Sequence, residues 1–148
     1  MAEAAPAQRI EQLIRPYIQA CNHADADAIA ACFCTDAVHY APGVAKWSGA
    51  VTIGGNFAGR AQELGHCWTV DQLLVDVDRC AAALEWTRFD RNARVLRGVD
   101  WFVIDPHTLK IREVRPYLAA VPNPDLTRQE LRDFDYAGRG YPTDAPPR

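Results

Sequence analysis

The first third of the chain carries apolar residues at a helical spacing. Between residues 10 and 21 they recur at intervals of three and four, as Ile10, Leu13, Ile14, Tyr17, Ile18 and Cys21. This spacing places them on one face of an amphipathic helix. Asp25 is a suitable N-cap for a second helix, and residues 50–64 are expected to form a third. Between them, residues 37–41 predict a short strand that Pro42 ends.

The period of the pattern changes from 3.6 to 2 after Gly65. Four alternating segments follow, over residues 66–77, 80–89, 93–104 and 109–118, and short polar turns separate them. Helices followed by strands are typical of the α+β class. We predict one domain over 1–148, a cone-shaped barrel in which a curved, mostly antiparallel sheet wraps around three N-terminal helices. Such a cone is a natural ligand cavity.

The last part of the chain lies outside this pattern. The core is expected over about 8–120, and residues 121–148 form a C-terminal extension. Thr127 and Glu130 have the spacing of a capping box, which predicts a short helix through Leu131 and Tyr136. We expect the aromatic side chains of this tail to pack back as a lid or against a partner subunit.

Composition excludes several classes of protein. The chain is 49% hydrophobic and 24% charged with a net charge of −3, which argues against disorder, a nucleic-acid footprint or a polybasic membrane patch. No signal peptide or apolar membrane span is apparent, so we expect a cytoplasmic protein whose five cysteines stay reduced. The histidines and cysteines lack metal-site spacing, and no glycine-rich phosphate loop occurs. We therefore expect no metal and no cofactor.

The N-terminal half resembles a known superfamily. Residues 16–22 and 25–29, then Phe33, 36–38, Pro42-Gly43 and Ser48-Gly49, are similar to the opening of ketosteroid isomerase. The chain thus resembles the nuclear transport factor 2-like, or SnoaL-like, superfamily, most clearly over 9–60 and colinearly over 66–118. That superfamily also includes scytalone dehydratase, limonene epoxide hydrolase and polyketide cyclases. The resemblance implies the cone fold and a homodimer formed through the outer face of the sheet.

The resemblance also implies catalytic residues. Tyr17 and Asp100 fall where the isomerase has its two oxyanion-hole donors, a tyrosine and a protonated aspartic acid. Two such donors in an apolar pocket stabilise an enolate oxygen. His66 matches a dehydratase histidine and is the first candidate for a general base. His39 shares strand parity with Ala41 and is the second candidate.

Three positions depart from the patterns of the relatives. Ala41 stands where the isomerase has its general base, Asn22 where the dehydratase has an aspartate, and Pro116 where epoxide hydrolases and cyclases have an acid. Three hypotheses follow. The first is a cofactor-free lyase or isomerase acting on a neutral, hydrophobic carbonyl compound of steroid, terpenoid or polyketide type. The others are a non-catalytic ligand-binding or structural module, and an epoxide hydrolase or cyclase with relocated acids.

The residues that line the cavity depend on strand register. A two-residue turn after Asp90 would turn Glu85 inward, whereas a three-residue turn would turn Trp86 and Arg88 inward, and the hydrophobic pattern favours Trp86. Parity turns Asp100 inward, where the alternative to a catalytic role is an ion pair with Arg88 or Arg97. The predicted wall consists of Tyr40, Trp47, Phe57, Trp68, Trp86, Phe102, Val114 and Leu118.

Overall fold

The computed structural model describes residues 4–121 and 123–147. Three helices, α1 to α3, span Pro6–Asn22, Ala26–Ala31 and Ala50–Leu64 in that part of the chain. Seven strands, β1 to β7, span Phe33–Ala41, Ala45–Ser48, Cys67–Asp76, Ala81–Phe89, Val95–Ile104, Ile111–Leu118 and Arg128–Gln129. The element order confirms the predicted α+β class.

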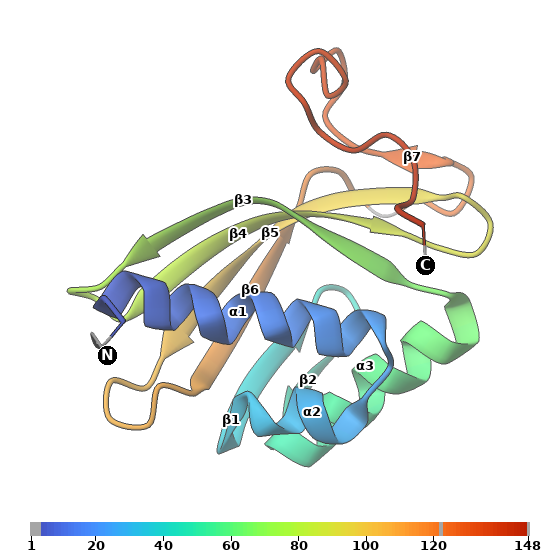
Figure 1. Cartoon of the computed structure of the whole chain (residues 1–148). Helices are drawn as coiled ribbons and strands as arrows, with labels where there is room; N and C mark the ends of the chain where they lie inside the picture. Colours follow the sequence, from blue (N-terminus) through green and yellow to red (C-terminus); the bar gives the residue numbers. More distant parts are fainter. Residues whose placement is uncertain (1–3, 122, 148) are drawn as a thin grey trace.

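The strands form one curled sheet. Its order is β2-β1-β6-β5-β4-β3, and β7 pairs with the start of β5. Most neighbours are antiparallel, while β1 with β6 and β5 with β7 are parallel. The three helices lie on one side of the long strands and the C-terminal tail lies on the other (Figure 1). We call these the inner and outer faces of the sheet.

The helices pack against the inner face for the reasons that the sequence suggests. The buried positions of α1 include Ile10, Ile14 and Tyr17, as its spacing predicts. Asp25 caps α2, since its side chain accepts a hydrogen bond of 3.0 Å from the Ala28 N–H. Gly54 allows α2 and α3 to meet closely, because a Cβ there would lie 2.4 Å from the Ala26 carbonyl oxygen. A glycine that would weaken an isolated helix is here required by packing.

Two local predictions were wrong. The first strand begins at Phe33 and is longer than 37–41, and β2 pairs with it in a hairpin that the sequence pattern did not indicate. The tail forms no helix over 131–136; it makes the short strand β7 and then turns. Glu130 does not cap a helix, because its carboxylate instead accepts hydrogen bonds from Arg97 and Arg128.

Strand β3 contains a bulge at Asp71. Val70 pairs with Trp86 and Gln72 pairs with Glu85, so Asp71 is an extra residue between two regular pairs. Before the bulge, Trp68 and Val70 face inward. After it, the inward side chains are Leu73 and Val75, which pack against the core, whereas Leu74 is 71% exposed.

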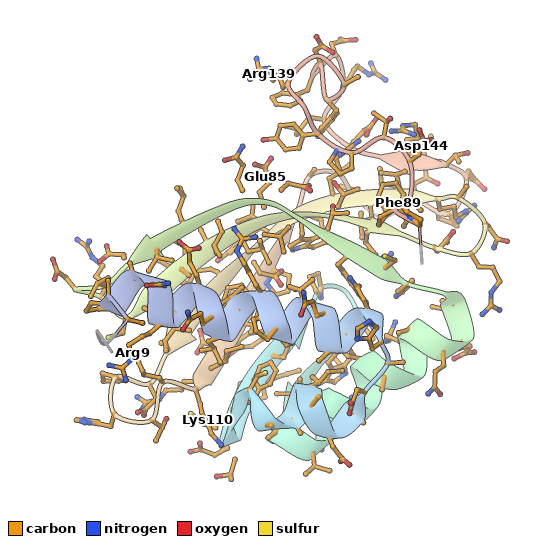
Figure 2. All side chains as sticks on the ribbon, viewed as in Figure 1. Arg9, Glu85, Phe89, Lys110, Arg139 and Asp144 are labelled. Atoms are coloured by element: carbon orange, nitrogen blue, oxygen red, sulfur yellow. The ribbon has the colours of Figure 1, made fainter. Side chains whose placement is uncertain are left out.

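The tail covers one end of the outer face with a polar network. Arg97, which is 3% exposed, donates hydrogen bonds to Glu130 at 2.7 Å and to the Thr87 hydroxyl at 2.9 Å. Its guanidinium lies 3.7 Å from the centre of the Tyr136 ring. The Thr87 hydroxyl donates to Asp71, and Tyr141 donates to Glu85, which points from the sheet toward the tail (Figure 2). The tail thus packs back onto its own sheet.

None of the helices in the described ranges is both long and apolar enough to cross a bilayer.

Candidate active site

A cavity of about 270 Å³ lies on the inner face of the sheet and is partly open to solvent. Each of the strands β1 to β7 contributes at least one residue to its wall, and α3 covers it from the other side. The described residues that line it are His39, Ala41, Pro42, Val44, Trp47, Phe57, Arg60, His66, Trp68, Trp86, Arg88, Leu96, Asp100, Pro116, Leu118 and Gln129. Its wall is aromatic and aliphatic, with a few polar groups, as ligand pockets are.

The cavity wall agrees only in part with the predicted one. Five predicted residues line it, namely Trp47, Phe57, Trp68, Trp86 and Leu118. Tyr40 does not, because it points to the opposite side of β1 and is 41% exposed. Phe102 and Val114 face inward but are fully buried in the core beneath the cavity. Parity identified the correct face for these two residues, but it carries no information on depth.

The turn between β4 and β5 turns Trp86 inward. Phe89 pairs with Val95 and Trp86 with Gly98, which is the register of the longer turn. Gly98 makes room for the indole, because a Cβ at this position would lie 2.5 Å from the Trp86 ring. Glu85 faces outward, where the tail binds it. The hydrophobic pattern was therefore the better guide to this strand.

Asp100 is the one carboxyl group among the described residues that line the cavity. It is 7% exposed, and its Oδ1 accepts a hydrogen bond of 2.8 Å from the Trp86 indole N–H. Neither Arg88 nor Arg97 pairs with it within the described residues, so the ion-pair alternative is excluded. Burial raises the pKa of Asp100 to about 7, and the Trp86 N–H lowers it in part.

Tyr17 lies under the cavity floor. It is 1% exposed, and its ring packs edge-on against Phe33, Phe57 and Phe102 at centroid distances of 5.3–6.2 Å. Burial raises its pKa well above the ordinary value, and the Cys21 thiol and Asp100 are near enough to add to this shift. Tyr17 is close to Asp100, but it does not form part of the cavity wall.

Both candidate histidines face the cavity and are buried. His39 is 3% exposed and His66 is 5% exposed. Both ring nitrogens of His39 and Nδ1 of His66 have no hydrogen-bond partner among the described residues. Burial lowers the pKa of His39 to about 4, although its contact with the Tyr40 backbone opposes the shift. Burial and the nearby Arg88 and Arg60 charges lower the pKa of His66 to about 4, against the influence of Asp90.

The strand register separates the cavity into two ends. Asp100 pairs with Pro116, and His39 pairs with Val114 one pleat further in. His39 and Asp100 therefore lie at the deep end, about 12 Å apart between Cα atoms by strand geometry. His66 directly precedes β3, whose first residues pair with Phe89 and Arg88. It therefore lies at the other end, which we call the mouth, and the register favours His39 as the neighbour of Asp100.

Three polar residues at the mouth were not among the predicted site residues. The sequence left open whether Arg88 faces the cavity. It does, on the same side of β4 as Trp86. Arg60 follows Phe57 by three residues on α3, a spacing that could have indicated a shared face. Gln129 comes from the tail, and its strand pairs beside Leu96. Nothing in the local pattern indicates that contact.

The three positions with altered acids have clear places in the structure. Ala41 and Pro116 line the cavity without offering a carboxyl group. Asn22 joins the end of α1 to β3, since its amide donates to the Trp68 carbonyl at 2.8 Å and accepts from the Trp68 N–H at 2.7 Å. In the described ranges, no group of three His, Cys, Asp or Glu side chains is arranged to hold a metal ion.

Known structures share this fold. A protein of unknown function with a cystatin-like fold from Methylobium petroleophilum PM1 is 38% identical, covers 96% of both chains and has a TM-score of 0.75. A putative polyketide cyclase from Xanthomonas campestris pv. campestris is 20% identical over 76% of this chain and 92% of its own, with a TM-score of 0.63. An LEH-like epoxide hydrolase from M. tuberculosis is 15% identical over 77% of this chain and 85% of its own, with a TM-score of 0.65. The last two establish a likeness of fold alone.

No curated protein matches the sequence. Residues 14–114 match the SnoaL-like domain, and this range runs from the middle of α1 to the middle of β6. The chain therefore belongs to the SnoaL-like family.

Proposed function

We propose that this protein is a small-molecule isomerase or lyase that carries out acid–base chemistry on a carbonyl compound without a cofactor. The observation that carries the proposal is Asp100, a desolvated carboxyl in an aromatic cavity. Its partner is an indole N–H, and no cation contacts it in the described part of the chain. Such a carboxyl exchanges its proton near neutral pH. Groups of this kind are concentrated at catalytic sites.

The proposed reaction begins with the carbonyl oxygen at the deep end of the cavity. Protonated Asp100 donates a hydrogen bond to this oxygen, and a neutral ring nitrogen of His39 removes a proton from the α-carbon. The electron pair moves into the enolate, whose oxygen Asp100 stabilises. Return of the proton to another carbon completes an isomerisation, and departure of a group from the β-carbon completes an elimination.

The two remaining candidates take other roles in this proposal. Tyr17 lies near Asp100 but does not form part of the cavity wall. It therefore acts as a positioning residue for Asp100 and does not contact the substrate. His66 lies at the mouth beside Arg88 and binds the substrate rather than removing its proton. Trp47, Phe57, Trp68 and Trp86 supply the apolar wall.

Hydrogen–deuterium exchange tests the chemistry before a natural substrate is known. We expect the protein to accelerate α-proton exchange of 2-tetralone in D₂O, followed by NMR. Asp100→Asn and His39→Gln should each lower the enzyme-catalysed rate by at least ~10²-fold. His107→Gln is the matched control, because His107 is exposed on a turn far from the cavity.

The same assay separates the alternatives. A wild-type rate equal to the background, together with ligand binding, would favour a binding module. Activity lost in His66→Gln but kept in His39→Gln would reverse the assignment of the base. Turnover of an epoxide by the wild type, lost in Asp100→Asn, would favour the hydrolase-type chemistry known for the LEH-like relative.

We also propose a homodimer through the part of the outer face that the tail leaves uncovered. Trp101 is 40% exposed there and Tyr117 is 60% exposed, on adjacent strands. We expect light scattering to give the mass of a dimer and Trp101→Glu to give that of a monomer. If light scattering on the wild type at about 100 µM gave the mass of a monomer, this proposal would be refuted.

A further inference from the structure

The mouth of the cavity holds positive charge without a matching carboxylate. Arg60 and Arg88 both line it, and the one lining carboxyl, Asp100, lies at the deep end. In the described part of the chain, no carboxylate lies within ion-pair distance of either guanidinium. The two histidines are neutral above a pH of about 4, because burial lowers the pKa of each. At neutral pH the cavity therefore carries net positive charge.

Arg88 is placed for a ligand rather than for the fold. It is partly buried between Trp68 on β3 and Leu96 on β5. The nearest acid is Asp90, but its Oδ1 accepts hydrogen bonds from the Asn92 and Arg94 N–H groups and shapes the turn. A half-buried guanidinium with no counterion loses hydration without recovering it from the protein. An anionic ligand group would restore that loss.

Two neighbours complete an anion site around Arg88. Arg60 lies over the Trp47 ring at 5.4 Å and approaches from α3. Gln129 lies next to Leu96 from the tail, and its Oε1 accepts the Asn123 N–H at 2.9 Å. Gln129 lines the cavity, and its amide NH₂ donates no hydrogen bond among the described residues. Proteins commonly bind carboxylates with guanidinium groups and amide donors, and this site contains two of the first and one of the second.

We propose that the substrate is an amphiphilic acid whose carboxylate binds Arg88, Arg60 and Gln129 at the mouth while its carbonyl reaches Asp100. This inference rests on the proposed function for the role of Asp100. It also replaces the neutral substrate of the first sequence-based hypothesis with an anionic one. Leu96, beside Arg88, is four residues from Asp100 on β5, or about 13 Å along the strand. The acid and the carbonyl of the substrate are therefore separated by an apolar body such as one or two rings.

A matched pair of fluorescent probes tests this charge preference. 1-Anilinonaphthalene-8-sulfonate carries an anion that stands in for the carboxylate, and N-phenyl-1-naphthylamine has the same aromatic body without a charge. We expect Arg88→Gln to weaken binding of the sulfonate at least ~10-fold and to change binding of the neutral probe less than ~2-fold. Arg88→Lys should recover part of the loss, because it keeps the charge but not the fork of donors.

Controls separate the site from the overall charge and from the fold. Arg132→Gln removes one exposed positive charge from the tail and should leave both probes unaffected. Arg60→Gln should weaken the sulfonate by about threefold, since Arg60 is the more peripheral cation. Thermal unfolding followed by circular dichroism checks that each variant is folded.

Two results would overturn the proposal. Equal loss of both probes in Arg88→Gln would mean that Arg88 only packs the wall. Unchanged sulfonate binding in this variant would mean that the mouth does not select an anion. Neither result depends on turnover, so the acid–base proposal stands or falls separately in the exchange assay. An enzyme for neutral ketones would accelerate α-proton exchange but would show no preference for the anionic probe.

Discussion

The two faces of the sheet bury polar side chains in opposite ways. On the outer face, Arg97 binds Glu130 and Thr87, and Thr87 in turn donates to Asp71; only Nη2 of Arg97 lacks a hydrogen-bond partner in this network, among the described residues. On the inner face, His39 has no hydrogen-bond partner among the described residues, and Asp100 has the Trp86 N–H alone. A buried network in which most groups are hydrogen-bonded stabilises a fold, whereas buried groups with few or no partners cost stability, and we infer that those of the inner face are retained for what they bind.

The first prediction concerns the Arg97 network of the outer face, whose loss should lower the free energy of unfolding. Arg97→Met should lower the free energy of unfolding by about 3 kcal/mol, because Glu130 and Thr87 lose their partner in a buried setting. Urea unfolding measures this change. Arg79→Gln removes an ion pair with 77% exposure on the arginine side, and its effect on the free energy of unfolding should be far smaller. Equal effects of the two variants would refute the contrast between buried and exposed pairs.

The second effect concerns the glycine that accommodates the cavity wall. Gly98→Ala places a Cβ against the Trp86 ring and 2.8 Å from the Tyr117 carbonyl oxygen. We expect a loss of about 2 kcal/mol in the free energy of unfolding and a shift in tryptophan emission, because both neighbours must move. Gly55→Ala is the control, since its Cβ would meet nothing within 4 Å. An unchanged emission spectrum in Gly98→Ala would show that the indole is not held by this contact.

Replacing the buried carboxyl of the inner face should raise the free energy of unfolding rather than lower it. Asp100→Asn is expected to raise the free energy of unfolding at pH 8 by about 2 kcal/mol while it lowers turnover, because it removes a charge that burial disfavours. Urea unfolding of the two proteins at pH 8 checks this result. A variant that is both less stable and inactive would assign Asp100 to the fold.

The last prediction concerns how the free energy of unfolding changes with pH. The unfolded histidines titrate near 6.5 and the folded ones near 4, so between these values the unfolded chain binds protons that the folded chain does not. Each histidine therefore lowers stability as pH falls from 6.5 to 4, by up to about 1.4 kcal/mol per pH unit. Asp100, with its pKa raised to about 7, acts in the opposite direction and cancels one of them.

The sign of that slope is measurable in one experiment. Wild-type stability should fall by up to about 1.4 kcal/mol per pH unit between pH 6 and 4.5, and Asp100→Asn should fall about twice as steeply. His39→Gln should be nearly independent of pH in this range, because the remaining histidine and Asp100 offset each other. Parallel slopes in all three proteins would contradict the buried, neutral state of His39.

Periodicity was sufficient for α1 and for the inner face of β5, but it missed β2 and wrongly predicted a helix in the tail. The apolar spacing of α1 and the alternation of β5 follow from burial on one side, so Tyr17 and Asp100 were assigned to the inner side correctly. Depth was not accessible in this way. Whether an inward residue lines the cavity, like Trp86, or lies beneath it, like Phe102, depends on how the sheet curls.

The residues at the mouth of the cavity could not be predicted from the sequence. Arg60 on α3, Arg88 on β4 and Gln129 on β7 meet only because the helix crosses the sheet and the tail returns to β5. No short-range pattern contains these contacts. The capping box at Thr127 also predicted a helix, but pairing of the tail with β5 and the Arg97–Glu130 ion pair outweighed this local preference.

The bulge at Asp71 has a consequence for comparing family members. Because the extra residue changes which alternate positions of β3 face inward, a relative that lacks it will carry its cavity residues one position out of phase along half of the strand. An alignment that sets these strands together without a gap will then equate wall residues of one protein with outer-face residues of the other. Placing the gap at Asp71 keeps equivalent positions of the two proteins in correspondence.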